Sequence, residues 1–225
     1  MSDLLTRTKF RTRVLSPTAR PTVIGQGADN QKLGGFVTKG RFKGYKIVTV
    51  SLEERATCPT SCHHWEDCYG NNMRWARRVD HTHPEFLVLL RRDLERELAV
   101  RGRLGVLVRL HVLGDFYSVD YVRFWEGMLT KHPRLAVFGY TARPFTGTIG
   151  LHISWMNSHY PERCVIRQSV PAGAKVDGPV AVGMRQGDAV PAGAFWCPEQ
   201  TGKTASCGTC AACWSTPKAV MFHEH

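Results

Sequence analysis

The strongest constraint on the fold is an alternation of short apolar strands with longer helical segments through the middle of the chain. Strands are predicted at residues 45–52, 105–113, 135–142 and 163–170, and helices at 84–101, 119–132 and 147–160. This alternation is typical of a parallel α/β sheet. About four βα units are too few for a closed eight-fold barrel. The sequence therefore predicts an α/β fold, either a partial (β/α) barrel or an open parallel sheet.

The helix predicted at 84–101 has the clearest boundaries. Pro84 suits its first turn, apolar residues recur at helical spacing, and Gly102 follows its last residue. Ser118 is expected to cap the next helix. A further helical stretch is predicted around the segment NNMRWARRVD.

Composition divides the chain into three parts. Residues 1–43 form a basic N-terminal arm rich in Gly, Thr and Pro, with a short hairpin around KLGGFVTKGRFKG and no expected part in the core. Residues 44–170 are the α/β core, which contains the first cysteine loop. Residues 171–225 form a C-terminal extension that is first rich in Gly and Pro and then rich in Cys, with short strands at most.

Charge and hydropathy narrow the class of partner. The formal net charge is +11 and Arg outnumbers Lys, so nucleic acid, a nucleotide or a phosphorylated small molecule is expected, with a generally basic solvated surface as the alternative. No apolar stretch of about 18 residues is present, so no membrane contact is expected. The charged N-terminus lacks the apolar region of a secretory signal, which predicts a cytoplasmic protein with reduced thiols.

Eight cysteines in a reducing compartment favour metal binding over disulfides. The first group lies in TCPTSCHHWEDCYGN and consists of Cys58, Cys62 and Cys68, with the spacing C-x3-C-x5-C. It follows the first predicted strand, at the carboxyl end where open α/β sheets bind ligands. Three thiolates can hold three irons of a [4Fe–4S] cluster and leave the fourth iron open.

Zinc is the alternative for this first group. The three cysteines with His63 or His64 would make a tetrahedral Cys3His site. The loop lacks the closely spaced ligand pairs usual for zinc, and the softness and spacing of its ligands favour the cluster.

The second group lies in the C-terminal extension. The segment FWCPEQTGKTASCGTCAACW carries Cys197, Cys207, Cys210 and Cys213, with the spacing C-x9-C-x2-C-x2-C. Three thiolates on one tight loop are typical of bacterial ferredoxin motifs. This complete set predicts a second, closed [4Fe–4S] cluster with a structural or electron-transfer role, with zinc as the alternative. Cys164 lies in an apolar strand and is expected to be a buried hydrophobic residue.

Two resemblances extend this interpretation. The cysteine loop after the first strand, ending in CYG, resembles the radical S-adenosylmethionine (SAM) superfamily, although its second gap is five residues instead of the usual two. The segments SLEERATCPTSC, CYGN, RLHVLGDFYS and FGYTARP are similar to the gene-product-88 family of phage-encoded and prophage-encoded proteins. The second resemblance covers roughly residues 45–145 and the terminal cysteine run.

The SAM resemblance implies an activity and its cofactors. The open iron would bind the amino and carboxylate groups of SAM, and one electron from an external reductant would cleave SAM to a 5′-deoxyadenosyl radical. The segment HVLGDF, with His111, Gly114 and Asp115, takes the place of the family's glycine-rich SAM motif, from which it departs in sequence. The second cluster would correspond to an auxiliary cluster.

Polar residues at the predicted strand ends complete the candidate site. His111 and Asp115 are the predicted catalytic pair because they flank a glycine turn. Gly114, Asp115, Tyr140 and Arg167 are predicted to bind the cofactor, since strand-end groups line the pocket in parallel α/β folds. The tryptophans, Trp75 among them, are expected to pack in the core or shield the clusters, with base stacking as the alternative.

These features predict an iron–sulfur protein, a radical SAM-like enzyme acting on a nucleotide, nucleic acid or other anionic substrate. Two other functions stay open. One is a non-catalytic iron–sulfur protein for electron transfer or redox sensing, and the other is a zinc-stabilised nucleic-acid-binding protein.

Overall fold

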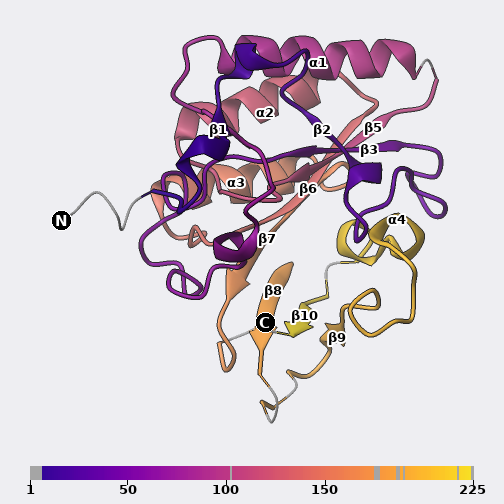
Figure 1. Ribbon diagram of the computed structural model, residues 1–225. Coiled ribbons are helices and arrows are strands. Elements are labelled where there is room, and N and C mark those ends of the chain that lie inside the picture. The colour runs from indigo at the N-terminus through magenta and orange to yellow at the C-terminus, as the bar shows by residue number, and fades with distance from the viewer. Residues whose placement is uncertain are drawn as a thin grey trace.

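The computed structural model describes residues 7–101, 103–174, 178–185, 188–189, 191–216 and 218–223. Its main feature is one sheet with the strand order β2-β3-β5-β6-β7-β8-β10-β9 (Figure 1). β2 runs antiparallel to β3, and the other neighbouring strands are parallel. The strands are β2 (Gly25–Gln26), β3 (Lys46–Val50), β5 (Val106–Leu110), β6 (Leu135–Thr141), β7 (Cys164–Val170), β8 (Val180–Met184), β9 (Phe195–Trp196) and β10 (Val220–His223).

Three helices connect the parallel strands and lie together on one side of the sheet (Figure 1). They are α1 (Phe86–Val100), α2 (Val119–Lys131) and α3 (Thr148–His159). Alternate residues of β5 show the two-sided packing that a strand imposes, because Val106 and Val108 pack with the helices and Leu107 packs on the opposite face. The prediction of an α/β fold is confirmed, and of its two forms the sheet is the open one, since β2 and β9 are separate edges.

The helices predicted at 84–101, 119–132 and 147–160 begin and end within two residues of the observed bounds of α1, α2 and α3. Ser118 caps α2 as expected, since its hydroxyl accepts a hydrogen bond from Tyr121 N at 3.1 Å. The helical stretch predicted around NNMRWARRVD is wrong. The chain there forms a 3-10 turn, η4 (Tyr69–Asn72), and then β4 (Arg78–Val79), which pairs in parallel with β1 (Val14–Leu15). The guanidinium of Arg78 donates hydrogen bonds to the carbonyls of Met73 and Ala76. In a continuous helix these carbonyls would instead accept from backbone amides four residues further on.

The N-terminal arm enters the core, contrary to the prediction that it would take no part. Leu33, Val37 and Phe42 are buried against Ile47 and Leu107 on the face of the sheet that the three helices leave open. A parallel sheet needs cover on both faces, and the arm supplies part of it. The remaining short elements are η1 (Arg11–Arg13), η2 (Pro17–Ala19), η3 (Gly27–Asp29), α4 (Cys207–Cys210) and η5 (Ala212–Trp214).

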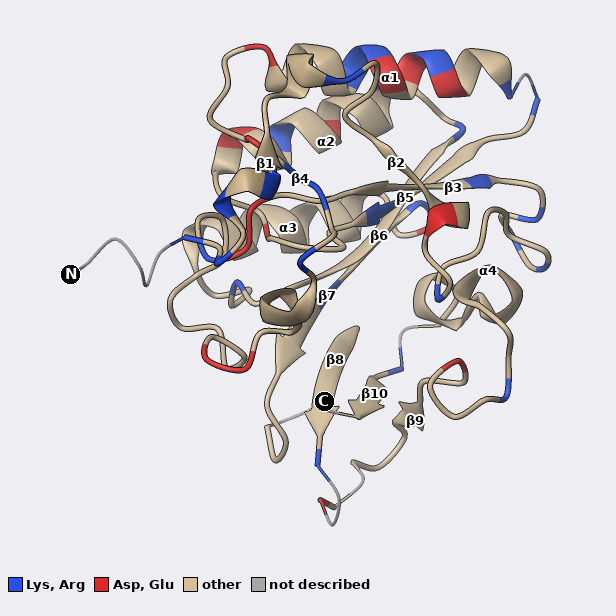
Figure 2. Ribbon diagram, in the orientation of Figure 1, with Lys and Arg blue, Asp and Glu red and all other residues tan. Residues whose placement is uncertain are grey.

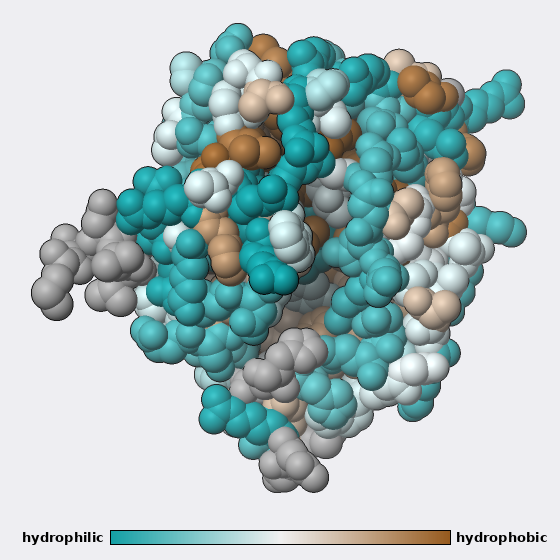
Figure 3. Space-filling view, in the orientation of Figure 1, coloured by the Kyte–Doolittle hydropathy of each residue, from teal (hydrophilic) through white to brown (hydrophobic). Residues whose placement is uncertain are grey.

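The C-terminal extension completes the sheet. β8 is buried along its whole length between β7 and β10, although Ala181 and Gly183 give it a weak strand signal in the sequence. No helix in the described ranges is long and apolar enough to cross a membrane. The face seen in Figure 3 is mainly hydrophilic, with hydrophobic residues in small separate patches.

Candidate functional site

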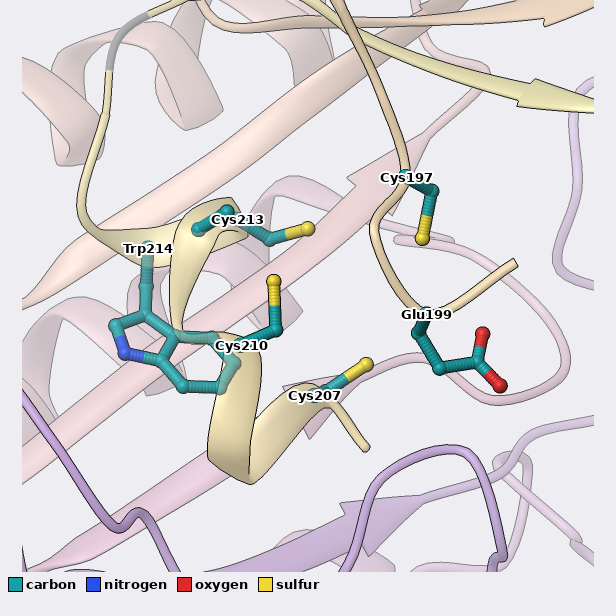
Figure 4. Close-up of a pocket in the computed structure, with 7 residues that line it drawn as sticks. Cys197, Glu199, Cys207, Cys210, Cys213 and Trp214 are labelled. Carbon is teal, nitrogen blue, oxygen red and sulfur yellow. The ribbon is translucent and has the colours of Figure 1, made fainter. Parts of the chain in front are cut away.

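The four cysteines of the second group converge from two segments of the C-terminal extension. Cys197 follows β9, whereas Cys207 and Cys210 belong to α4 and Cys213 to η5. Figure 4 shows their sulfur atoms turned towards the same space, beside Glu199 and Trp214. The four cysteines line one small pocket together with Glu199, Ala212 and Trp214. The structure therefore brings this predicted set of residues together.

The N-terminal arm holds the second cysteine group in place. The backbone amides of Cys207 and Gly208 donate to the carbonyls of Lys32 and Leu33, at 2.7 and 2.9 Å. These are amides of the first turn of α4, which have no partner within the helix itself. A side chain at Gly208 would collide with the carbonyl of Phe36, so glycine is needed where α4 meets the arm.

Two residues predicted to bind SAM lie beside this second group. Arg167 is fully buried and donates to the carbonyls of Cys213, Thr216 and Lys218, at 3.1, 2.5 and 2.7 Å. The hydroxyl of Tyr140 donates to the sulfur of Cys213 at 3.0 Å. Both residues therefore position the second cysteine loop, and their predicted role in cofactor binding stays a prediction.

The first cysteine group occupies the loop that follows β3, at the carboxyl edge of the sheet. Cys58, Cys62 and Cys68 are each partly exposed, and the charges of their thiolates repel one another. Burial raises the pKa of all three, and in Cys58 the negative charge of Asp115 adds to the effect. Backbone N–H groups donate to the three sulfurs, in order from Arg55, His64 and Gly70.

All eight cysteines of the chain are free thiols. The imidazoles of His63 and His64 contact each other with ring centroids 4.1 Å apart and planes tilted by 49°, and His64 Nδ1 lies 3.5 Å from Asp67 Oδ1. Among the residues that the structure describes, which include both cysteine groups, no set of three or more His, Cys, Asp or Glu side chains is placed to hold a metal ion.

Asp115 ties the ends of β5 and β6 to the first cysteine loop. Its carboxylate accepts hydrogen bonds from Thr141 Oγ1 and Phe116 N at 2.7 Å, and from Ala142 N at 2.8 Å. Its own amide donates to Thr57 Oγ1 at 3.0 Å. Burial raises the pKa of the carboxyl to about 6, against the lowering effect of these hydrogen bonds.

The cysteine loop also packs closely against the glycine turn before Asp115. Gly114 has a φ of +82°, and a Cβ there would lie 2.7 Å from Thr57 Oγ1 and 2.8 Å from Leu52 Cβ. Arg143 donates to the carbonyls of Thr57 and Phe116, at 2.7 and 2.9 Å. Leu52 and Thr57 therefore lie close to the backbone at Gly114, and the predicted role of this glycine in cofactor binding stays a prediction.

His111 lies in an aromatic part of the core. Its Nε2 is 3.0 Å from the hydroxyl of Tyr121, and its ring meets that of Phe116 edge-on at 4.9 Å. Burial, with a smaller effect of Arg109, lowers its pKa to about 3, so the imidazole is neutral at physiological pH. Its Nδ1 has no hydrogen-bond partner in the described part of the chain. The predicted role of His111 in catalysis stays a prediction.

Sequence reasoning missed a buried ion pair beneath the first cysteine loop. Glu54 receives two hydrogen bonds from Arg78, at 2.7 and 2.8 Å, and a third from Thr8 Oγ1 at 2.6 Å. Arg78 also donates to the carbonyl of Gly70, two residues after Cys68. The available signal was the run SLEER, which places two carboxylates at the end of a buried strand.

We expect Asp115→Ala to lower the free energy of unfolding by at least about 2 kcal/mol, because it leaves the donors of Thr141, Phe116 and Ala142 without their acceptor. Asp115→Asn should lose less, since its amide oxygen can still accept two of these hydrogen bonds. Urea denaturation of the two variants and the wild type measures the series. Equal stability of Asp115→Ala and the wild type would show that Asp115 does not anchor the loop.

The fold and the site define a protein with an open, mostly parallel α/β sheet, four cysteines that line one pocket and three more in the loop after β3. The family model described as Gene product 88 matches residues 24–216, and the chain belongs to this phage protein family. The match contains both cysteine groups and confirms the resemblance to the gene-product-88 family, whereas the resemblance to the radical SAM superfamily has no support from it. Comparison with curated proteins and with solved structures gives no match.

Proposed function

We propose that this chain is an iron–sulfur protein with a closed [4Fe–4S] cluster at the second cysteine group and an open one at the first. The observation that carries the proposal is the convergence of Cys197, Cys207, Cys210 and Cys213 on one space (Figure 4). Cysteine thiolates are the usual ligands of such clusters. Zinc bound by four thiolates is the competing assignment for the same residues.

Hydrogen bonding supports a cluster at the second site, and binding it would require the loss of thiol protons. Burial and the neighbouring thiolate of Cys213 raise the pKa of Cys207 to about 12, so without a metal this sulfur holds its proton. A bound cluster would displace the protons and balance the thiolate charges. The hydrogen bond from Tyr140 to Cys213 is of the kind that tunes the potential of an iron–sulfur cluster.

The first group supports an open cluster. It has three thiols, each partly exposed, and it lies at the carboxyl edge of the sheet, where α/β proteins bind ligands. Its fourth iron would take SAM, and the net charge of +11 favours a nucleotide, nucleic acid or other anionic substrate. Asp115 already accepts three hydrogen bonds. Its role in this function is therefore to position the cysteine loop, and SAM binding does not require it.

An electron-transfer protein without SAM chemistry is the second candidate, and Arg109 favours it. The guanidinium of Arg109 lies 4.5 Å from the ring centroid of Tyr140, which contacts Cys213. Arg109 also acts electrostatically on Cys207 and on Tyr69, the neighbour of Cys68. Arg109 thus acts on one cysteine of the second group and on a sequence neighbour of the first group.

Electron paramagnetic resonance of the anaerobically purified, reduced protein separates the candidates. We expect signals from two reduced clusters, and we expect SAM to change the one that Cys62→Ala removes, with release of 5′-deoxyadenosine. Two clusters that do not respond to SAM would leave the electron-transfer function. Zinc in place of iron would overturn both candidates in favour of a zinc-stabilised protein.

A further inference from the structure

An arginine-rich surface with an exposed tryptophan lies next to the first cysteine loop. We name it the Trp75 surface and define it as Arg13, Arg20, Arg74, Trp75 and Arg77. The parallel pairing of β1 with β4 brings Arg13 beside the segment that carries Arg74, Trp75 and Arg77, and Arg13 Nη2 donates to the carbonyl of Trp75 at 2.6 Å. Lys and Arg residues gather in the segments around β1 and β4 (Figure 2).

Trp75 is unusually open for a tryptophan. Its side chain is 73 % exposed, and the guanidinium of Arg74 lies 4.9 Å from the centroid of its ring. The half-exposed Trp155 on α3, by contrast, is stacked on His159. Transfer of an indole ring out of water lowers the free energy of the system. A tryptophan that is exposed to this extent is therefore suited to contact a partner.

The arginines of the Trp75 surface have no carboxylate partner at ion-pair distance in the part of the chain that the structure describes. Arg77 is close enough to Arg20 and Arg13 to be repelled by both, and Asp29 is the acidic group near it. In the described ranges none of Arg13, Arg20, Arg74 and Arg77 forms an ion pair. Unbalanced guanidinium groups attract a polyanion, and their planar donors suit phosphate oxygens.

We propose that the Trp75 surface binds single-stranded nucleic acid, with a base stacked on the indole of Trp75 and phosphates held by the arginines around it. Stacking on an exposed aromatic ring requires an unpaired base, which favours a single strand over a duplex. An anionic membrane fits less well. Within the two described segments 11–20 and 72–79, Trp75 is the one large hydrophobic side chain that is exposed. Membrane insertion needs several such side chains.

The position of this surface connects it to the first cysteine group. Arg78 lies three residues beyond Trp75 and holds the carbonyls of Gly70 and Met73 while it pairs with Glu54. This buried anchor fixes the Trp75 segment to the loop of Cys68. The inference rests on the proposed function in one respect, since it names the anionic substrate class for that cysteine site.

Binding of a fluorescent thymidine oligonucleotide of about 16 nucleotides, followed by anisotropy at several salt concentrations, tests the proposal. We expect affinity to fall as salt rises, and Trp75→Ala to weaken binding about 5-fold to 100-fold, with partial rescue by Trp75→Phe. Arg77→Gln should weaken binding and reduce the salt slope by about 0.7 for the lost phosphate contact. Trp155→Ala is the matched control and should bind as the wild type does.

Three results would overturn the proposal: equal binding by Trp75→Ala and Trp155→Ala, tighter binding to the corresponding duplex, or binding of anionic vesicles in preference to the oligonucleotide. The assay needs neither SAM nor reductant, and iron is measured in the same samples. Full iron content without binding contradicts the Trp75 surface alone. Binding that depends on Trp75 in a protein without iron contradicts the clusters alone.

Discussion

Glu54→Gln should lower the free energy of unfolding by about 3–5 kcal/mol, because it leaves the guanidinium of Arg78 buried without its counter-charge. Arg78 is fully enclosed and Glu54 is 2 % exposed, so water cannot replace the lost carboxylate. The same guanidinium holds the carbonyls of Gly70 and Met73. Loss of the pair should therefore loosen the segment after Cys68 as well as lower global stability.

Urea denaturation gives the stability, and hydrogen exchange of residues 68–79 gives the local effect. Arg123→Gln is the matched control, because its pair with Asp120 is largely exposed on both sides, and exposed pairs contribute about 0–1 kcal/mol. If Glu54→Gln changed stability no more than this control, the buried pair would not be what holds the cysteine loop.

Cys62→Ala and Cys207→Ala should each remove about four of about eight iron atoms per chain, and each should leave the other cluster in place. The first group contains no spare thiol, and each thiol of the second group faces the same space as its partners. Removing one ligand thus affects one cluster. The double variant should retain almost no iron.

Cys164→Ala is the control for these variants. Cys164 is buried among the residues packed under the helices, and its sulfur lies 3.3 Å from Asn157 Oδ1. Its replacement should leave the iron content unchanged. If both Cys62→Ala and Cys207→Ala kept the iron of the wild type, neither cysteine group would be a cluster site.

The parts of the fold that the sequence predicted are those with a regular hydrophobic period. Strands such as β5 consist almost entirely of apolar residues. α1 has apolar residues at helical spacing, with a proline just before it and a glycine just after it, so local signals were sufficient. The segment around Trp75 has no such period. Its conformation depends on the pair of Arg78 with Glu54, two residues that are 24 positions apart in the chain, and no local sequence pattern predicts that pairing.

The candidate site divides in the same way. Cysteine spacing indicated which thiols would converge in the second group, because three of the four belong to one short segment. The distant partners of Asp115 and Arg167 could not be predicted, because Thr141, Ala142, Cys213 and Lys218 belong to strands and loops far from them in the chain. The sequence placed Arg167 at a strand end, but its contacts with the C-terminal extension depend on β8 and β10 joining the sheet.

Iron and acid-labile sulfide analysis of the anaerobically purified protein is the most direct test of the central claim that the two cysteine groups hold iron–sulfur clusters. We predict about eight iron atoms and an equal amount of sulfide per chain, with a brown colour that bleaches on reduction. Stoichiometric zinc without sulfide, or a fully folded protein that contains no metal after anaerobic reconstitution with iron and sulfide, would contradict it.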